Sequence, residues 1–435
     1  MDGPSGGLGP FEAVRGLTVE ADLPPVVRVR QRLSDAALPD IAATTAAALE
    51  PLRARIRPGM RIALTAGSRG IRDKPAVLRA AGEALRGMGA EPFIVPAMGS
   101  HGGAIAEGQV ELLADLGITE GSTGMPIRAT METVVLAQLP GGPAVHLDRN
   151  AAEADGILAI NRIKAHTDFS GAVESGLAKI VAIGLGKRSG AEAIHSFGPA
   201  RLGHWVPRVA GVIAASGHLL GGLAIVEDGH DRAAQVAFLE ASDIGGPVEA
   251  ALLAEAKRLA PTLPFEAADV LVVDRMGKDK SGSGLDTNVI GRMMIRGTPE
   301  FVRPRIVNIV VLDLTDGSHG NGVGIGLADF VPLRLIAKLD LRAMYLNALT
   351  SGLGGVQRGQ LPLALPTDRD AISAAVATCA PADPGRIRLA RIRDTLDLEE
   401  LWLSPALLGD LAGDPRLEVL GAPEPLRFEA GRLVG

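Results

Sequence analysis

Four basic side chains in one short segment have the types and spacing that acid–base or covalent chemistry requires. The segment 161–195 reads NRIKAHTDFSGAVESGLAKIVAIGLGKRSGAEAIH and contains His166, Lys179, Lys187 and His195. An imidazole exchanges a proton near neutral pH, and a buried lysine tends to lose its charge and become a nucleophile or a covalent tether. Lys179 begins the apolar run KIVAIGLGK, so it could be such a lysine. A solvated lysine at a strand end is the alternative.

A further histidine, His101, lies in the glycine-rich segment AMGSHGG, which follows an apolar run and precedes a helical pattern. A helix N-terminus lowers the pKa of a nearby histidine and keeps the ring neutral. His101 would then suit a general base, although a structural loop histidine is an equal alternative. Four others, His146, His204, His218 and His230, have no comparable setting, and we expect them to be structural or exposed.

The loop Gly67-Ser68-Arg69-Gly70 follows another apolar run. Its amides, hydroxyl and guanidinium could hold a carboxylate or phosphate, but an ordinary turn explains the same residues. His195 alone could not hold a metal ion, and the chain contains no HExxH or HxH pattern, so spacing alone does not indicate a metal site.

A third polar loop, 274–288, reads DRMGKDKSGSGLDTN and carries Lys278 and Lys280. It could close over the substrate and clamp a carboxylate, and a solvated charged loop is the alternative. His319 lies in the glycine-rich segment 316–330, which could be only a backbone hinge.

The elements that position these loops alternate between strand and helix patterns. Apolar runs predict strands at 61–66, 91–97, 134–139, 156–160, 178–185 and 222–227, and a helical pattern joins the first two. This alternation indicates α/β layering with a largely parallel sheet. Ligands of such sheets bind beyond the carboxyl ends of the strands, where the polar loops lie.

At 435 residues, the chain is too long for one hydrophobic core. A helical pattern ends at PTLPF near residue 264, and new strands are expected at 268–274 and 306–314. We therefore predict two α/β domains with largely parallel sheets, 1–264 and 265–435, with the active site in the cleft between them.

Composition narrows the class of protein. A net charge of −6 and 3% aromatic residues argue against nucleic-acid binding. The single cysteine, Cys379, excludes an internal disulfide and a cysteine-rich zinc site. No signal-peptide pattern or membrane-length apolar run is present. We expect a cytoplasmic protein with a small-molecule partner and without a membrane or nucleic-acid partner; a homodimer would be compatible with these features.

The order of GSRG, GSHGG, HTDFSG and SGLAK, with a histidine sixteen residues after the lysine, resembles the nickel-pincer nucleotide-dependent lactate racemase family. The resemblance covers most of the chain and is strongest over 61–200. It implies a pyridinium mononucleotide with two sulfur-containing arms and a nickel–carbon bond, made by separate biosynthetic enzymes and tethered through a thioamide.

By this resemblance, Lys179 is the tether, His195 the nickel ligand, and His101 and His166 the acid/base pair on opposite faces of a 2-hydroxy acid. Hydride would pass to the cofactor and return to either face of a planar 2-keto acid. The other contacts implied are to the cofactor from Ser68, Arg69, Gly99 and Ser100, and to the substrate from Arg69, Lys278 and Lys280.

The chain departs from the family in three places. It lacks the acidic residue and proline of the DxTRP-like turn, has Ile183-Gly184 where the family has Pro-Gly, and differs in the 274–288 loop. Together with the polar residues Asp286 and Arg292, these departures favour a substrate other than lactate, such as a diacid or a sugar acid. Two alternatives stay open: a hydride-exchanging oxidoreductase with the same cofactor, and a non-catalytic nucleotide- or anion-binding protein.

Overall fold

The computed structural model describes residues 9–68, 70–379 and 383–435. Contacts divide the chain into two compact units, residues 34–260 and residues 1–33 with 261–435. We call them the first unit and the second unit. The chain passes between them at residue 261, close to the predicted boundary at 264. Residues 1–33 differ from the expectation, because β1 (Val27–Gln31) pairs with β14 (Glu400–Leu403) and β15 (Leu417–Val419) in the second unit.

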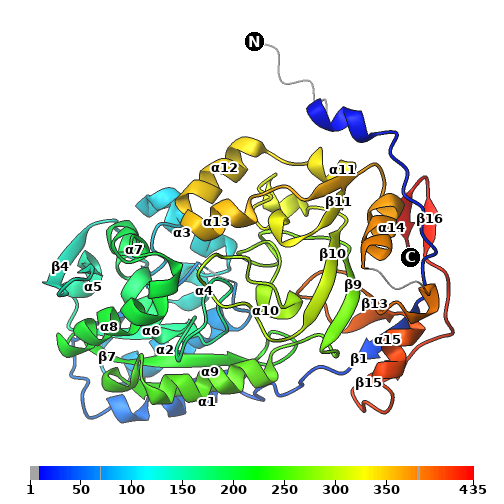
Figure 1. Ribbon diagram of the computed structural model, residues 1–435. Helices are drawn as coiled ribbons and strands as arrows, with labels where there is room; N and C mark the ends of the chain where they lie inside the picture. The colour runs from blue at the N-terminus through cyan, green and yellow to red at the C-terminus, as the bar shows by residue number, and fades with distance from the viewer. Residues whose placement is uncertain (1–8, 69, 380–382) are drawn as a thin grey trace. The chain divides into compact units, whose positions relative to one another are not determined.

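The first unit is built on a five-stranded sheet of order β3-β2-β6-β7-β8 (Figure 1). The first four strands in this order are parallel and β8 is antiparallel. Its strands are β2 (Arg61–Ala66), β3 (Glu91–Pro96), β6 (Gly156–Arg162), β7 (Leu219–Glu227) and β8 (Ala233–Glu240), with a separate hairpin of β4 (Thr133–Gln138) and β5 (Ala144–Asp148).

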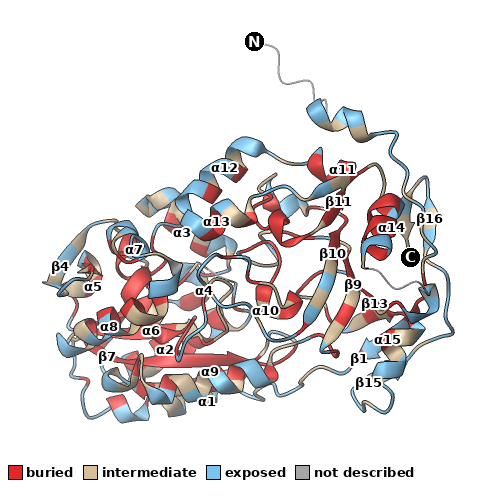
Figure 2. Cartoon of the chain, in the orientation of Figure 1, coloured by how far each residue is buried: buried red, intermediate tan, exposed pale blue. Residues whose placement is uncertain are grey.

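Helices cover both faces of this sheet. They are α1 (Ile41–Ala48), α2 (Lys74–Gly87), α3 (Ala106–Asp115), α4 (Glu120–Thr123), α5 (Arg149–Ala152), α6 (Leu177–Lys179), α7 (Lys187–His195), α8 (Leu202–Ala215) and α9 (Pro247–Leu259). Alternate residues of β2 enter different cores, because side chains along a strand point to opposite faces. Ile62 and Leu64 pack with α1 and α2, while Ala63 packs with α6 and α8. Figure 2 shows β7 buried along its whole length.

One predicted strand of this unit is wrong. Residues 178–185 are not extended: α6 ends at Lys179 and a π-helical segment, Ile180–Gly184, follows. Leu185 donates to the carbonyl oxygen of Ile180 at 2.9 Å, one residue beyond the α-helical spacing. The residues of this segment are all buried, so the apolar run lacks the polar face by which a helix is recognised in a sequence.

The second unit contains an eight-stranded sheet of order β12-β11-β10-β9-β13-β14-β1-β15. The first five strands in this order are parallel, and β14 and β1 are antiparallel to their neighbours. The strands not yet named are β9 (Ala267–Val273), β10 (Arg305–Val311), β11 (Phe330–Pro332), β12 (Leu363–Leu365) and β13 (Leu389–Ile392), with a small hairpin of β16 (Arg427–Glu429) and β17 (Arg432–Val434).

Two apolar clusters again lie on opposite faces of the sheet. Val270 and Val272 of β9 pack with the helix α14, and Leu271 and Val273 pack on the other face. The helices of this unit are α10 (Thr287–Ile290), α11 (Leu333–Ile336), α12 (Leu341–Thr350), α13 (Gly352–Arg358), α14 (Asp368–Thr378) and α15 (Pro405–Asp410). Both units are thus α/β structures with largely parallel sheets, as the sequence predicts. No helix in the described part of the chain is long and apolar enough to cross a membrane.

Candidate active site

The carboxyl ends of β3, β2, β6 and β7 meet at one edge of the first unit's sheet, because these strands are parallel neighbours. The loops that leave this edge contain Ser68, His101 and His166. Ser68 is half-buried. Arg69, the proposed anion-binding arginine, lies outside the described residues.

His166 and Lys179 are in direct contact: the amine Nζ lies within hydrogen-bonding distance of the imidazole Nε2. The other ring nitrogen, Nδ1, accepts the backbone N–H of Asp168 at 3.0 Å. Nε2 is therefore the ring nitrogen that faces Lys179. The ring also packs on Phe169, with centroids 4.5 Å apart. The structure thus brings together two residues that are 13 positions apart in the chain.

A buried glutamate holds the loop that carries His166. Glu174 accepts the His166 backbone N–H at 2.7 Å through one carboxylate oxygen. The other oxygen accepts from Lys257 Nζ at 2.7 Å and from the Gly171 N–H at 3.2 Å. The exposed fraction of Glu174 is 2%, so its carboxylate is shielded from water, while the Lys257 side chain that pairs with it is partly exposed. Glu174 positions the histidine through its backbone.

Lys179 is positioned by a close approach of α9 to the start of α6. Glu249 on α9 accepts the Ala178 N–H at 3.1 Å and the Gly245 N–H at 2.8 Å. A Cβ atom at Gly176 would clash with the carboxylate of Glu249 and would lie 2.8 Å from Ile163. Burial raises the pKa of Glu249, while its bonds to backbone N–H groups lower it. The glycine of SGLAK is therefore required by packing around the lysine.

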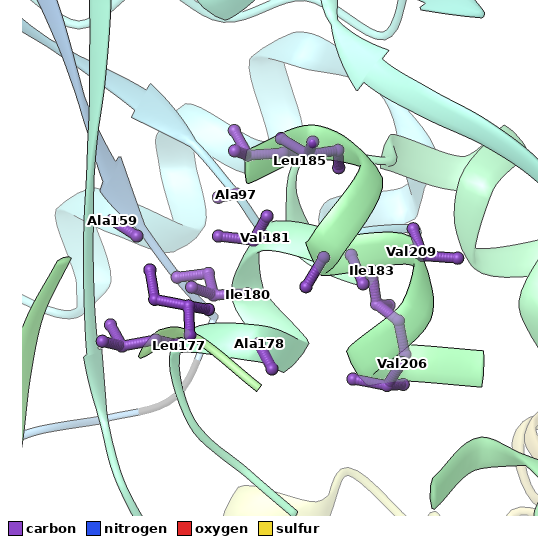
Figure 3. Packing of buried hydrophobic residues seen from close by; sticks show 14 of the residues in the cluster. Ala97, Ala159, Leu177, Ala178, Ile180, Val181, Ile183, Leu185, Val206 and Val209 are labelled. Atoms are coloured by element: carbon purple, nitrogen blue, oxygen red, sulfur yellow. The ribbon is translucent and has the colours of Figure 1, made fainter. Parts of the chain in front are cut away.

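The apolar side chains of α6 and the π-helical segment pack into the core and hold the backbone that carries Lys179. Figure 3 shows Leu177, Ile180 and Val181 lying beside Ala97, which follows β3, and Ala159 of β6. Val206 and Val209 of α8 lie on the other side. Because this packing is buried, the backbone at Lys179 is fixed by the core, and its half-buried side chain extends from it.

His195 is the last residue of α7. Desolvation by the surrounding protein lowers its pKa, the charge of Lys179 lowers it further, and Asp168 raises it. His195 thus lies close enough to Lys179 for their charges to interact. Among the described residues, no group of three or more histidine, cysteine, aspartate or glutamate side chains could hold a metal ion. A metal at His195 would therefore need other donors.

His101 belongs to the same edge of the sheet. Its Nδ1 donates to the Met98 carbonyl oxygen at 2.7 Å, so a neutral ring has its lone pair on Nε2 and can accept a proton there. The preceding loop is tied to the segment that follows Lys179: the Gly99 N–H donates to Gly184 at 3.2 Å. Gly99 is buried and Ser100 is exposed. That His101 and His166 lie on opposite faces of a bound substrate stays a prediction.

A buried polar network supports the His101 loop, and no motif in the sequence indicates it. Gln109 on α3 donates to the carbonyl oxygens of Gly99, at 2.9 Å, and of His101, at 3.3 Å. Its own side-chain oxygen accepts from Lys187 at 3.1 Å, and Lys187 forms an ion pair with Asp148 at 2.9 Å. Lys187 and Asp148 are fully buried. Burial lowers the pKa of Lys187 and raises that of Asp148, and each charge partly offsets the effect on the other.

Lys278 and Lys280 lie in the second unit. Lys278 donates from Nζ to the Gly282 carbonyl oxygen at 3.0 Å, and Lys280 lies 3.6 Å from Asp394. The first contact lies within the 274–288 loop, and the second ties the loop to residue 394. The assignment of either lysine to a substrate stays a prediction, as does the hinge role of the exposed His319.

No protein-family model matches the chain, and no curated protein matches it. Two solved structures to which it is similar are a protein from Thermotoga maritima determined in a structural genomics programme and the lactate racemase apoprotein from Thermoanaerobacterium thermosaccharolyticum. The first has a TM-score of 0.47 at 14% identity, over 64% of this chain and 72% of the other. The second has a TM-score of 0.40 at 15% identity, over 65% and 68%. At these scores and identities, neither likeness carries a conclusion about this chain.

Proposed function

We propose that this protein is a racemase or epimerase of 2-hydroxy acids that uses a nickel-pincer nucleotide tethered to Lys179. The observation that carries the proposal is the contact of Lys179 with His166, together with the charge interaction between Lys179 and His195. One neighbourhood therefore contains a candidate tether, Lys179, a candidate nickel ligand, His195, and a candidate acid/base, His166.

The residues present are compatible with this cofactor. Lys179 would form the thioamide, and His195 would offer one imidazole nitrogen to nickel. The cofactor brings two sulfurs and a carbon of its own, so it does not require a cluster of protein ligands, and soft sulfur with one imidazole suits Ni(II). When bound, the cofactor would supply a hydride acceptor and donor next to the substrate carbon.

The chain's own task would be to move the hydroxyl proton and to orient the substrate. His101 has its lone pair on Nε2 when neutral, so it would accept a proton there. His166 would act from the opposite face, which inversion at a hydroxyl-bearing carbon requires. Ser68, Arg69, Gly99 and Ser100 would contact the cofactor, and Arg69, Lys278 and Lys280 would bind the substrate carboxylate.

The tether is tested by producing the protein together with the enzymes that make the cofactor. We expect stoichiometric nickel and a mass increase on the peptide that contains Lys179. The Lys257 peptide from the same digest is the internal control and should keep its unmodified mass. A Lys179→Arg variant should lose the adduct, and a His195→Gln variant should keep the adduct while losing nickel. An unmodified Lys179 in the co-produced protein would refute the tether.

The reaction is tested with single enantiomers of a panel of 2-hydroxy acids, including diacids and sugar acids. We expect the opposite enantiomer to form with a C2 deuterium label retained, because the hydride that leaves C2 is the one that returns. We expect His101→Ala and His166→Ala each to lower kcat by about 100-fold or more. Release of a keto acid without inversion would indicate an oxidoreductase instead. Nickel-loaded protein that neither inverts nor oxidises any substrate of the panel would contradict both reactions.

A further inference from the structure

A buried lysine that the proposed reaction does not use lies at the same edge of the first unit's sheet. Lys74 is the first residue of α2, and only 1% of its surface is exposed. Its Nζ has no hydrogen-bond partner among the residues that the structure describes. An ammonium group that is buried without partners is costly, so this amine is expected to meet a further group.

The surroundings of the amine are positive. Burial and the nearby charge of Arg162, at the end of β6, lower the pKa of Lys74 to about 7. Lys74 also lies at the N-terminal end of α2, where the helix dipole favours an anion. A lysine at a helix N-terminus with an arginine nearby is a setting in which a negatively charged ligand is stabilised.

The nearby carboxylates are engaged elsewhere. Glu227 on β7 pairs with Arg162, and burial raises the pKa of Glu227 while Arg162 lowers it. Asp73, next to Lys74, accepts the Ala233 N–H of β8 at 2.7 Å. Arg162 is the charged residue that acts on the pKa of Lys74. No carboxylate of the described residues therefore pairs with Lys74.

There is space beside the amine. A Cβ atom at Gly67 would lie 3.7 Å from Lys74 Nζ, 3.7 Å from the Ala97 carbonyl oxygen and 3.4 Å from Ile180. These are ordinary van der Waals separations, so a group of about methyl size fits between the amine and the ends of β2 and β3. The absence of a side chain at Gly67 keeps this space open.

We propose that Lys74 and Arg162 form a binding subsite for an oxyanion, either the phosphate or the carboxylate of a small molecule, and that one oxygen of the anion occupies the methyl-sized space at Gly67. The anion neutralises the buried ammonium and accepts its hydrogen bonds. The subsite does not depend on the proposed reaction, because it requires neither a tethered cofactor nor a hydride transfer.

The experiment uses the full-length protein without cofactor and titrates it with inorganic phosphate or with lactate, against chloride at equal ionic strength. We expect at least one oxyanion to raise Tm and to bind by calorimetry. Because the ammonium is the form that binds, binding takes up a proton at about pH 8 and weakens as pH rises further. The uptake is measured as a difference in binding enthalpy between two buffers with different ionisation enthalpies.

Two variants and one control decide the assignment. Lys74→Met should abolish the proton uptake and weaken binding by about tenfold or more. Gly67→Ala should also weaken binding because its methyl group fills the space, while the fold is kept. Arg258→Met removes one exposed positive charge of the same unit and should bind like the wild type.

The two ligands separate the sources of the oxyanion: tighter binding of phosphate identifies a phosphorylated ligand, and tighter binding of lactate identifies a carboxylate. Absence of binding to the wild type, or wild-type binding with unchanged proton uptake in Lys74→Met, would overturn the subsite. Neither result would bear on the tether at Lys179, whose test is the mass of the modified peptide.

Discussion

The pKa of His195 is lowered by desolvation and by the charge of Lys179, while Asp168 acts in the opposite direction. Lys179 in turn contacts His166. These side chains therefore interact with one another electrostatically in the protein without a ligand. Residues arranged in this way respond measurably when one neighbour is replaced.

We predict that Lys179→Met raises the pKa of His195, because the variant removes a nearby positive charge, and that Asp168→Asn lowers it. The measurement is an NMR titration of the imidazole C–H protons in the protein without cofactor. Lys257→Met, which removes a lysine that pairs with Glu174, is the control and should change the pKa of His195 less. An unchanged pKa in both test variants would show that the three side chains are not neighbours.

Lys74 leads to a prediction about stability and pH. Its pKa of about 7 in the folded protein lies below that of the unfolded chain. Between about pH 7 and pH 10 the unfolded chain therefore binds more protons, so this residue makes the free energy of unfolding rise with pH, by at most about 5 kcal/mol. Lys74→Met should lack this rise and should be the more stable protein near pH 6. Urea denaturation at several pH values in anion-poor buffer measures it; parallel pH profiles would contradict the prediction.

At the scale of elements, the site depends on the close approach of α9 to α6. Glu249 accepts the first N–H groups of α6, and Gly176 leaves room for the carboxylate. The π-helical segment then packs under the loop that follows β3 through the contact of Gly99 with Gly184. The strand edge, α6 and α9 thus form one packed assembly around Lys179.

Gly176→Ala should destabilise the protein by about 1–3 kcal/mol, because its methyl group would meet the Glu249 carboxylate and Ile163. Gly211→Ala on α8 is the matched control: its Cβ would meet no atom within 4 Å, and alanine should stabilise this helix by about 0.5–1 kcal/mol. Urea denaturation measures both effects. A Gly176→Ala variant as stable as the wild type would show that this approach is looser than described.

At the scale of the whole molecule, the chain begins in the second unit, forms the first unit and then returns. β1 completes the sheet of the second unit by pairing with β14 and β15, and Val27 and Val29 are buried there. The second unit is therefore made of two segments that are distant in sequence, while the first unit is continuous.

Val29→Asp should therefore destabilise the second unit alone, because a carboxylate would be buried in its core. Hydrogen exchange followed by mass spectrometry should show faster exchange in β14 and β15, with unchanged exchange in β2 and β6. Arg30→Gln is the control, because the neighbouring Arg30 is exposed and loses only a surface ion pair with Glu418. Equal acceleration in both units would mean that they unfold as one.

Regular patterns in the sequence were sufficient for much of the fold. Strands such as 61–66 and the helix after them were predicted because alternation and helical spacing are local properties of the chain. The segment 178–185 was mistaken for a strand because its residues are buried on every side, which removes the periodic signal. The place of β1 could not be predicted either, since strand pairing over several hundred residues leaves no local pattern.

The sequence by itself determined which residue types are available for chemistry, namely His101, His166, Lys179 and His195 in glycine-rich segments. Only the tertiary structure decided what surrounds them. Glu249, Gln109 and Lys74 carry no recognisable motif. Their importance comes from burial and, for Glu249 and Gln109, from partners far away in the chain. Burial and distance depend on how separate segments pack, and a linear sequence does not contain that information in readable form.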